Sequence, residues 1–301
     1  MTAAAGAGEV LLEVEGLRKH YPTQQGWFGA SGPKVHAVDG VSFSIHAGET
    51  LGLVGESGCG KSTTAKLILR LQAPTEGVIR WRGRDIGPMS QAQLRPVRRE
   101  LQAVFQDPYA SLNPRMRAAD IVGEPIRNYE PLPAAQMRER VAQIFARVGL
   151  RTDQMVKYPF EFSGGQRQRL GIARALSVQP KLIVCDEPVS ALDVSVQAQV
   201  INLLMDLQER LALTCLFIAH DLRLVRHVCA RVAVMYRGRI LEMGRTEALF
   251  RSPAHPYTRA LLSAMPVPDP DARPQRIPWN PDECDLKLPL REVETGHQAA
   301  V

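Results

Sequence analysis

Short apolar stretches alternate with longer amphipathic ones along most of the chain, and this alternation predicts the class of fold. Residues 182–185 form a continuous apolar run, as expected for a strand buried on both faces of a parallel sheet. Further strands are predicted over residues 11–17, 41–45, 50–54, 101–105, 213–219 and 231–236. Apolar residues at helical spacing predict helices over residues 61–71, 134–148 and 195–211. Strands that alternate with helices predict an α/β fold with a parallel sheet.

Three segments have a different texture. Prolines punctuate residues 107–180, which also contain apolar residues at helical spacing, and we interpret this part as a mostly helical insertion. Glycine, proline and serine predict a loop over residues 27–34. The tail from Pro266 to Pro289 holds seven prolines, which predicts an extended arm packed on the surface or a partly disordered segment.

The composition is that of a soluble globular protein, with 45% hydrophobic and 23% charged residues among 301. No apolar run approaches the roughly 18 residues that cross a bilayer, and residues 1–8 lack the basic and apolar regions of a secretory signal. We therefore expect neither an integral membrane protein nor an exported one. The five cysteines lie far apart without a CxxC pair, which favours a reduced, cytosolic setting in which they pack as small apolar side chains.

The formal net charge of +6 raises the question of nucleic acid or a membrane surface as a partner. Basic residues exceed acidic ones only slightly in each third of the chain, which argues against a concentrated basic surface. The arginine-rich stretch over residues 80–99 is best interpreted as a solvated face. The charge distribution therefore does not predict binding to nucleic acid.

The stretch that follows residues 50–54 matches the phosphate-loop pattern GxxxxGK[ST]. Its glycines allow successive backbone N–H groups to line an anion-binding nest, and the helix that follows adds a positive N-terminal end. Lys61 is expected to reach the β- and γ-phosphates and the Ser62 hydroxyl to ligate Mg²⁺. The predicted nucleotide-binding residues here are Gly55, Glu56, Ser57, Gly58, Cys59, Gly60, Lys61, Ser62 and Thr63.

Two acidic residues end the apolar run at 182–185. Asp186 would lie at the carboxyl edge of the sheet, where it can hold Mg²⁺ or its water. Glu187 follows and can orient and deprotonate a water for in-line attack on the γ-phosphate. Such a pair alone would often be a helix cap or a surface feature, but beside a phosphate loop it predicts phosphoryl chemistry.

A second glycine-rich turn opens a helix at Ser163, Gly164, Gly165 and Gln166. Taken alone, it could be an N-capping serine in a flexible turn. Together with the phosphate loop, it resembles the signature sequence of the ABC transporter ATPases. In that family the phosphate loop of one subunit and the signature of another enclose one nucleotide, and Ser163 and Gly165 would contact the γ-phosphate held by Lys61 of the other subunit.

The resemblance extends over residues 10–265 and implies roles for four further residues. Tyr21 is similar to the aromatic residue that stacks on adenine, and Gln106 to the glutamine that contacts Mg²⁺ and the attacking water. Asp193 lies in the loop that crosses the dimer interface, and His220 matches the histidine that senses the γ-phosphate. The catalytic set is therefore Glu187, His220 and Gln106, and the expected Mg²⁺ ligands are Ser62, Gln106 and Asp186.

The same resemblance implies the architecture. It is a P-loop NTPase with a RecA-like parallel sheet core, an antiparallel β subdomain and an inserted helical subdomain at about residues 107–180. The cassette would cover residues 9–265, and residues 266–301 would form a proline-rich C-terminal extension.

Three stretches resemble one branch in particular, the oligopeptide/dipeptide importer ATPases: residues 55–60, 105–114 and 255–262. This branch implies ATP and Mg²⁺ as ligands and a place at the cytoplasmic face of the cell membrane. Its implied partners are a second ATPase, with a heterodimer favoured over a homodimer, two integral-membrane permeases and an extracytoplasmic solute-binding protein. Residues 107–117 would lie against a permease helix. Members often carry several cysteines in the extension, but Cys284 alone cannot hold a four-ligand iron–sulfur cluster, so we expect none.

Three alternatives stay open. The chain could be a cassette outside transport that acts on nucleic acid or ribosomes, although it has one set of motifs and no sustained heptads. It could be an accessory cassette of a phosphonate-degrading complex, or a regulatory nucleotide-binding module without hydrolysis, against which the presence of Glu187 and His220 counts. The solute, the pairing of the two ATPases and the role of the extension do not follow from the sequence.

Overall fold

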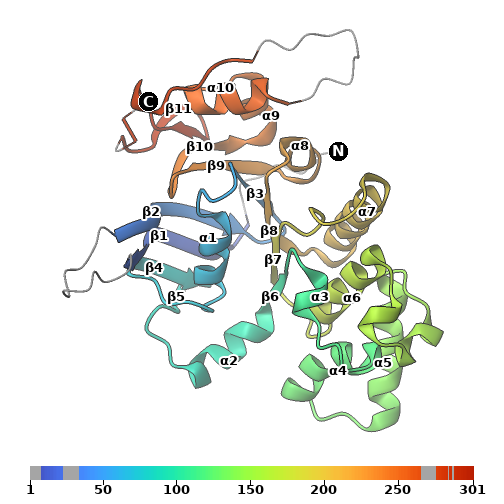
Figure 1. Ribbon diagram of the computed structural model, residues 1–301. Helices are drawn as coiled ribbons and strands as arrows, with labels where there is room; N and C mark the ends of the chain where they lie inside the picture. The colour runs from blue at the N-terminus through green and yellow to red at the C-terminus, as the bar shows by residue number, and fades with distance from the viewer. Residues whose placement is uncertain (1–7, 23–33, 266–275, 284, 287) are drawn as a thin grey trace, which may run out of the picture. The chain divides into compact units, whose positions relative to one another are not determined.

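The chain divides into two compact units. Unit 1 combines Met1–Pro88 with Phe217–Val301, and unit 2 is Met89–Leu216. The computed structural model describes residues 8–22, 34–265, 276–283, 285–286 and 288–301 (Figure 1). The loop predicted over residues 27–34 therefore lies outside the described residues except for Lys34, which opens a strand. Residues 266–275, 284 and 287 of the proline-rich tail also lie outside them.

An antiparallel sheet forms one layer of unit 1 (Figure 1). Its order is β2 (Lys34–His46), β1 (Val10–Pro22), β4 (Glu76–Trp81) and β5 (Arg84–Asp85). The apolar alternation of β1 buries Leu12 and Val14, and Leu17 is buried after a shift in the strand register. The strands predicted over residues 11–17 and 41–45 are confirmed, and each extends to 13 residues. The expected antiparallel β subdomain is thus present.

A second sheet of unit 1 has the order β11-β12-β10-β9-β3-β8. Its strands are β3 (Thr50–Val54), β8 (Thr214–Ala219), β9 (Arg231–Tyr236), β10 (Arg239–Arg245), β11 (Arg291–Glu294) and β12 (His297–Ala299). β3 and β9 run parallel, and every residue of β3 is buried, as its apolar sequence predicts. β10, β12 and β11 extend this sheet by antiparallel pairing, which the sequence did not predict for the end of the tail.

Unit 1 also contains four α-helices and one 3₁₀ turn among its described residues. They are α1 (Lys61–Ile68), α8 (Leu222–Val228), α9 (Thr246–Arg251), α10 (Pro256–Ser263) and the 3₁₀ turn η3 (Pro281–Glu283). The helix predicted over residues 61–71 is confirmed, but it ends at Ile68. Arg70 adopts a left-handed conformation with φ of 51°, which an α-helix does not continue through.

Unit 2 contains the strand order β8-β7-β6, because the division of the chain falls within β8. β6 (Leu101–Val104) and β7 (Leu182–Asp186) run parallel, and β7 is buried throughout as predicted. Its helices are α2 (Gln91–Glu100), α3 (Pro108–Ser111), α4 (Ala118–Tyr129), α5 (Ala134–Arg147), α6 (Gly164–Leu176) and α7 (Val194–Leu211). The 3₁₀ turns η1 (Thr152–Val156) and η2 (Pro159–Glu161) complete it.

The predicted helical insertion corresponds to α3 to α6. α4, α5 and α6 pack against one another, and Figure 1 shows them as one helical group. The amphipathic face of α5 buries Val141, Ile144 and Phe145, and the Phe145 side chain is fully enclosed. The helical character of residues 107–180 is therefore confirmed, while the expected boundaries of the subdomain and of the extension stay predictions.

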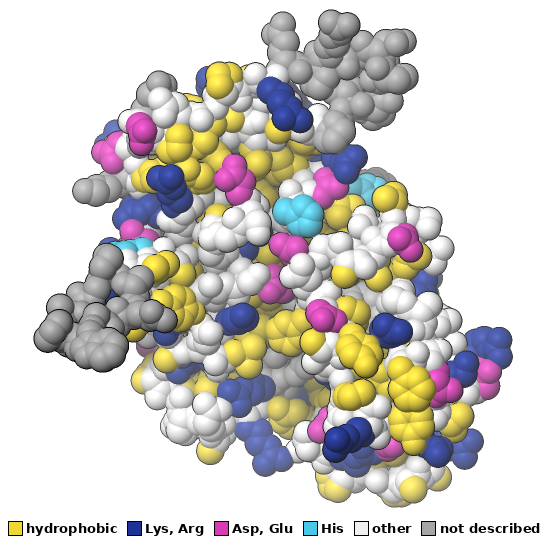
Figure 2. All heavy atoms as spheres, in the orientation of Figure 1, with side chains coloured by type: hydrophobic (Ala, Val, Ile, Leu, Met, Phe, Trp, Pro, Cys, Tyr) yellow, Lys and Arg dark blue, Asp and Glu magenta, His cyan; other side chains and the backbone are white. Residues whose placement is uncertain are grey.

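Two observations bear on partners. No helix among the described residues is long and apolar enough to cross a membrane. On the face that Figure 2 draws, Lys and Arg side chains are interspersed with Asp and Glu side chains. The even distribution of charge along the sequence is therefore matched on this face.

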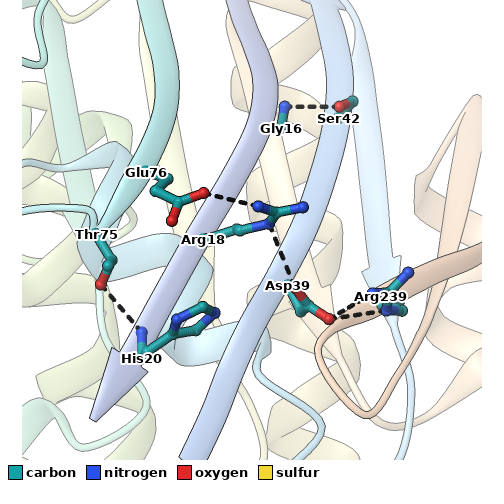
Figure 3. Close-up of polar contacts among 8 residues, drawn as sticks. All are labelled: Gly16, Arg18, His20, Asp39, Ser42, Thr75, Glu76 and Arg239. Atoms are coloured by element: carbon teal, nitrogen blue, oxygen red, sulfur yellow. Dashed lines mark hydrogen bonds and ion pairs between the residues drawn. The ribbon is translucent and has the colours of Figure 1, made fainter. Parts of the chain in front are cut away.

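A charged cluster connects four strands of unit 1, β1, β2, β4 and β10 (Figure 3). The Arg18 guanidinium of β1 lies between the carboxylates of Glu76 and Asp39, at 2.7 and 3.4 Å. Arg239 of β10 donates two hydrogen bonds to Asp39 Oδ2, at 3.0 and 2.5 Å. Burial alone would raise the pKa of Asp39, but Arg239 and then Arg18 favour the charged form, so the pKa lies below the ordinary value of 3.8.

This cluster predicts a pH-dependent contribution to stability. Asp39→Asn should lower the free energy of unfolding at neutral pH by about 1 kcal/mol, because Arg239 loses its charged partner and Arg18 loses one of its two. A group whose folded pKa is depressed stabilises above its unfolded pKa, and the contribution is lost as pH falls through the folded pKa. The difference between wild type and variant in urea unfolding should therefore be constant at pH 6–8 and shrink below about pH 4.

Asp206→Asn is the matched control, because it removes the same charge from an exposed position on α7. This variant should stay within about 0.5 kcal/mol of wild type at every pH tested. A deficit of Asp39→Asn that stays unchanged down to pH 3 would show that the carboxylate does not act through its charge.

Candidate nucleotide-binding site

The phosphate loop joins β3 to α1 within unit 1, as predicted. Two of its glycines are required by close backbone contacts. A Cβ atom at Gly55 would lie 2.1 Å from the Met235 carbonyl oxygen, and one at Gly60 would lie 2.2 Å from that of Ala37. Gly60 also has φ of 111° at the N-terminal cap of α1, a conformation that L side chains rarely adopt. The loop can therefore fold this way only with glycine at both positions.

Lys61 is turned into the loop that carries it. Its side chain is 4% exposed, and Nζ donates to the carbonyl oxygens of Gly55 and Glu56 at 2.8 Å each. The Cys59 sulfur lies 3.7 Å from the same nitrogen, and burial raises the pKa of this thiol. The ammonium group is thus held at the concave side of the loop by backbone oxygens.

The other predicted loop residues are distributed around this centre. Glu56, Ser57 and Gly58 are exposed, while Ser62 and Thr63 are half-buried on the first turn of α1. The first turn of an α-helix leaves N–H groups without helical partners, so it presents donors to an anion.

Contacts from distant parts of unit 1 hold the loop from outside. The Gly238 N–H, in the turn between β9 and β10, donates to the Cys59 carbonyl oxygen at 2.8 Å. The Glu56 N–H donates to the Tyr257 hydroxyl of α10 at 3.3 Å. Sequence reasoning missed both contacts. The residues involved are 179 and 201 positions from the loop residues they contact, and no local pattern signals such a pairing.

Tyr21 and His220 also belong to unit 1. Tyr21 lies at the end of β1, next to the His20 that Figure 3 shows, and its hydroxyl donates to Gln72 Oε1 at 2.5 Å. The Lys19 ammonium lies 5.3 Å from the centre of the Tyr21 ring. His220 is exposed directly after β8, and Asp221 caps the following helix α8.

The acidic pair lies at the end of β7 in unit 2. Asp186 is the last residue of the strand and is 8% exposed. Glu187 has φ of 47°, an uncommon conformation for a residue with a side chain. Ser190 donates to the Glu187 carbonyl oxygen through both its N–H, at 3.3 Å, and its hydroxyl, at 3.1 Å. Two hydrogen bonds from Ser190 thus hold the strained backbone conformation of the predicted catalytic residue.

The predicted signature opens α6 in unit 2. Ser163 caps the helix and forms a capping box with Gln166, with hydrogen bonds of 3.3 and 3.0 Å. A Cβ atom at Gly165 would lie 2.4 Å from Val196 of α7. One at Gly164 would lie 3.3 Å from Leu192.

The structure therefore brings the signature together with the loop that contains Asp193. Asp193 is exposed at the start of α7, and its carbonyl oxygen accepts the N–H groups of Val196 and Gln197. Gln106 is exposed after β6, next to Asp107, which caps α3. The predicted residues thus fall into a unit 1 group and a unit 2 group. The first group holds Tyr21, the phosphate loop and His220, and the second holds Gln106, Ser163–Gln166, Asp186, Glu187 and Asp193.

Comparison with known proteins agrees with these motifs. The family model described as "ABC transporter" matches residues 38–190, and the model described as "Oligopeptide/dipeptide transporter, C-terminal region" matches residues 241–286. The chain is 54% identical over 270 residues to the probable peptide ABC transporter ATP-binding protein y4tS of Sinorhizobium fredii, which covers 90% of this chain and 76% of that protein. It is 51% identical to the oligopeptide transport ATP-binding protein OppF of Escherichia coli, which covers 90% of this chain and 82% of that protein.

Solved structures give the same assignment. The ATP-binding cassette MJ0796, in a dimeric post-hydrolysis state with ADP and Pi, matches with a TM-score of 0.70 and 27% identity. The match covers 78% of this chain and 99% of that one. CbiO1 from Clostridium perfringens matches with a TM-score of 0.69 and 28% identity over 81% of this chain and 92% of that one. The predicted P-loop NTPase fold is confirmed, and the chain belongs to the ABC transporter family as an ATP-binding, ATP-hydrolysing subunit.

Proposed function

We propose that this chain is the ATP-binding subunit of an importer that takes up di- or oligopeptides or a related small solute. The observation that carries the proposal is the match of residues 241–286 to the C-terminal region of oligopeptide/dipeptide transporters. The peptide transport names of relatives with about half of their residues identical support it. The match of residues 38–190 is to ABC transporters in general, whereas the match of residues 241–286 is to a region described for oligopeptide/dipeptide transporters.

The proposed partners are two integral-membrane permeases, an extracytoplasmic solute-binding protein and a second, related ATPase. The subunit would work at the cytoplasmic face of the membrane. Within unit 2, residues 107–117 present an apolar side chain suited to a permease helix, because Tyr109 of α3 is 51% exposed. Asp107 caps α3 and Pro108 is its first residue, which gives this short helix a defined start.

Nucleotide binding would use the Lys61 ammonium group and the backbone N–H groups of the phosphate loop. Lys61 donates to two carbonyl oxygens of its own loop and can exchange them for β- and γ-phosphate oxygens. The exchange keeps the ammonium group hydrogen-bonded throughout, while the phosphates gain the N–H groups at the start of α1. Tyr21 would stack on the adenine.

The donor set proposed for Mg²⁺ fits that ion. Ser62, Gln106 and Asp186 offer a hydroxyl, an amide and a carboxylate oxygen, and Mg²⁺ prefers oxygen ligands. When bound, the ion would neutralise charge on the phosphate oxygens. For an iron–sulfur cluster, Cys284 remains the sole cysteine of residues 266–301, so the absence of a cluster stays a prediction.

Glu187 would orient the attacking water and accept its proton. Its left-handed backbone, fixed by Ser190, directs the side chain differently from the alternation of β7 and can serve this role. His220 would sense the γ-phosphate.

Two cassettes would close head to tail on two nucleotides. Ser163 and Gly165 of one subunit would face the γ-phosphate held by Lys61 of the other, and Asp193 would cross the interface. The dimeric state of the similar cassette MJ0796 supports this arrangement. ATP binds the closed pair better than the open one, so it shifts the population towards closure, and hydrolysis reverses the shift.

The cargo can be tested in proteoliposomes that contain this subunit, the permeases, a second ATPase and the solute-binding protein. The permeases and the second ATPase would be those that neighbouring genes encode. Di- or oligopeptides should raise ATP hydrolysis and drive accumulation of labelled peptide. Stimulation by a non-peptide solute alone would overturn peptide import. Salt-dependent binding of DNA or RNA by the purified subunit would instead favour a cassette outside transport.

A first prediction concerns the phosphate loop. Gly60→Ala should abolish binding of an ATP analogue in equilibrium titration, because the new methyl group would meet the Ala37 carbonyl oxygen at 2.2 Å. Gly83→Ala is the control, since Gly83 also has a positive φ of 76° but open space around a Cβ atom. The control should lose about 1 kcal/mol of stability and bind nucleotide normally. Equal binding by both variants would refute the proposed role of the loop.

A second prediction concerns hydrolysis. Glu187→Gln should bind ATP as wild type does but turn it over at least about 100-fold more slowly, because the amide cannot accept the proton of the attacking water. Glu209→Gln makes the same change on the exposed side of α7 and should hydrolyse ATP normally. Steady-state release of phosphate measures both variants, and near-normal turnover by Glu187→Gln would eliminate this role.

A further inference from the structure

One side chain of the C-terminal region contacts the phosphate loop. The Tyr257 hydroxyl accepts the Glu56 N–H at 3.3 Å, and the Tyr257 side chain is 1% exposed. The Glu56 N–H belongs to the same peptide group as the Gly55 carbonyl oxygen, which accepts Lys61 Nζ at 2.8 Å. The Glu56 carbonyl oxygen, in the next peptide group, also accepts Lys61 Nζ at 2.8 Å. The same oxygen accepts the Cys59 N–H at 3.3 Å. Tyr257 therefore holds Glu56 through its N–H group, and Glu56 in turn holds Lys61 and the Cys59 N–H through its carbonyl oxygen.

Tyr257 is in turn fixed by a chain of buried hydrogen bonds. The Tyr257 N–H donates to His255 Nδ1 at 3.0 Å, which requires the His255 proton on Nε2. Burial lowers the pKa of His255, which agrees with a neutral ring. The His255 N–H donates to Glu242 Oε2 at 3.0 Å, and the Ala254 N–H donates to Glu242 Oε1 at 2.8 Å.

The chain ends at the last strand. His297 of β12 makes a 2.7 Å hydrogen bond through Nε2 to Glu242 Oε1. Glu242 and His255 are fully buried, and His297 is 2% exposed. A carboxylate so deep in the fold depends on all its donors, since leaving it without one imposes a large desolvation penalty. The pairing of β12 with β10 thus determines how Glu242 holds residues 254 and 255, which lead to Tyr257.

Aromatic packing supports the same connection. The Tyr257 ring lies 4.6 Å from that of Tyr236 and 5.4 Å from that of Trp279 in the tail. Tyr236 ends β9, directly before the turn in which Gly238 donates to the Cys59 carbonyl oxygen. Ring spacings of 4.5–7 Å are those of favourable aromatic pairs. The tail, through Trp279, and the phosphate loop therefore both contact one aromatic cluster within unit 1.

We propose that Tyr257 is a positioning residue for the phosphate loop, and that β12 sets the nucleotide affinity of the subunit through the buried chain His297–Glu242–His255–Tyr257–Glu56. The inference rests on the proposed role of the loop and gives the His-Pro-Tyr motif at 255–257 a function. Seating of β12 keeps Glu56 in the conformation from which Lys61 reaches the phosphates. Loosening of β12 lowers affinity without touching any group that contacts the nucleotide.

The first test removes the Tyr257 oxygen alone. Tyr257→Phe in the full-length subunit should raise the Kd for a non-hydrolysable ATP analogue about 3- to 10-fold, the loss expected for one hydrogen bond to the loop. In the assembled transporter, KM for ATP should rise by a similar factor with kcat nearly unchanged. The melting temperature should change little, because the ring stays in place. Such a split between KM and kcat is not expected of general destabilisation.

Thr258→Val is the matched control on the same helix. Thr258 is 1% exposed, and its hydroxyl has no hydrogen-bond partner among the described residues, so its loss should leave Kd within twofold of wild type. Lys61→Ala is the reference for the loop itself. If Lys61→Ala fails to weaken binding, the proposed phosphate site is wrong. If it weakens binding and Tyr257→Phe does not, only the positioning role falls.

The second test addresses the chain to β12. His297→Ala should raise Kd in the same direction as Tyr257→Phe, and His297→Gln, which keeps a donor, should restore most of the affinity. The double variant His297→Ala/Tyr257→Phe should have a Kd no higher than that of the single variant with the higher Kd, because both changes act on the same chain of hydrogen bonds. Effects that multiply fully in the double variant, or normal affinity in His297→Ala folded at the assay temperature, would overturn the connection.

Discussion

The phosphate loop passes so close to two neighbouring backbones that a single methyl group would displace it. A Cβ atom of Gly55 would lie only 2.1 Å from the Met235 carbonyl oxygen, and one of Gly60 only 2.2 Å from the Ala37 carbonyl oxygen. Met235 is in β9, the parallel neighbour of β3, and Ala37 is in β2 of the antiparallel sheet. The loop therefore has its shape only while both strands are in register, and the two sheets of unit 1 are constrained through it.

Burial in the sheet explains which strands could be predicted from the sequence. β3, β7 and β9 are nearly continuous apolar runs because they are buried in the sheet, and their predicted bounds agree closely with the structure. β11 and β12 were not predicted. They have four and three residues, and β12 pairs with a strand some 55 positions earlier, so neither periodicity nor length signals them. The same short range of local patterns left β10 without a prediction.

In the candidate site, too, local features could be predicted from the sequence and tertiary ones could not. The phosphate loop, the acidic pair and the signature are contiguous in sequence, and the conformation of each depends on a few neighbouring residues. The N-capping role of Ser163 was considered from the sequence and is present, whereas its capping box with Gln166 was not predicted. The left-handed backbone of Glu187 and the contact of Gly165 with Val196 are tertiary facts. Sequence could name these residues but could not show the conformations that distinguish them.

The affinity of such a loop is a difference between two sets of hydrogen bonds. Lys61 already has two acceptors at 2.8 Å, so a phosphate gains only what its own oxygens and charge add over those carbonyl groups. The net gain per exchanged bond is then about 1 kcal/mol, so a small displacement of Glu56 can offset much of it. A contact from a residue 201 positions away can therefore matter to binding without approaching the nucleotide. This balance lets the outer support of the loop influence binding alongside the residues that face the phosphates.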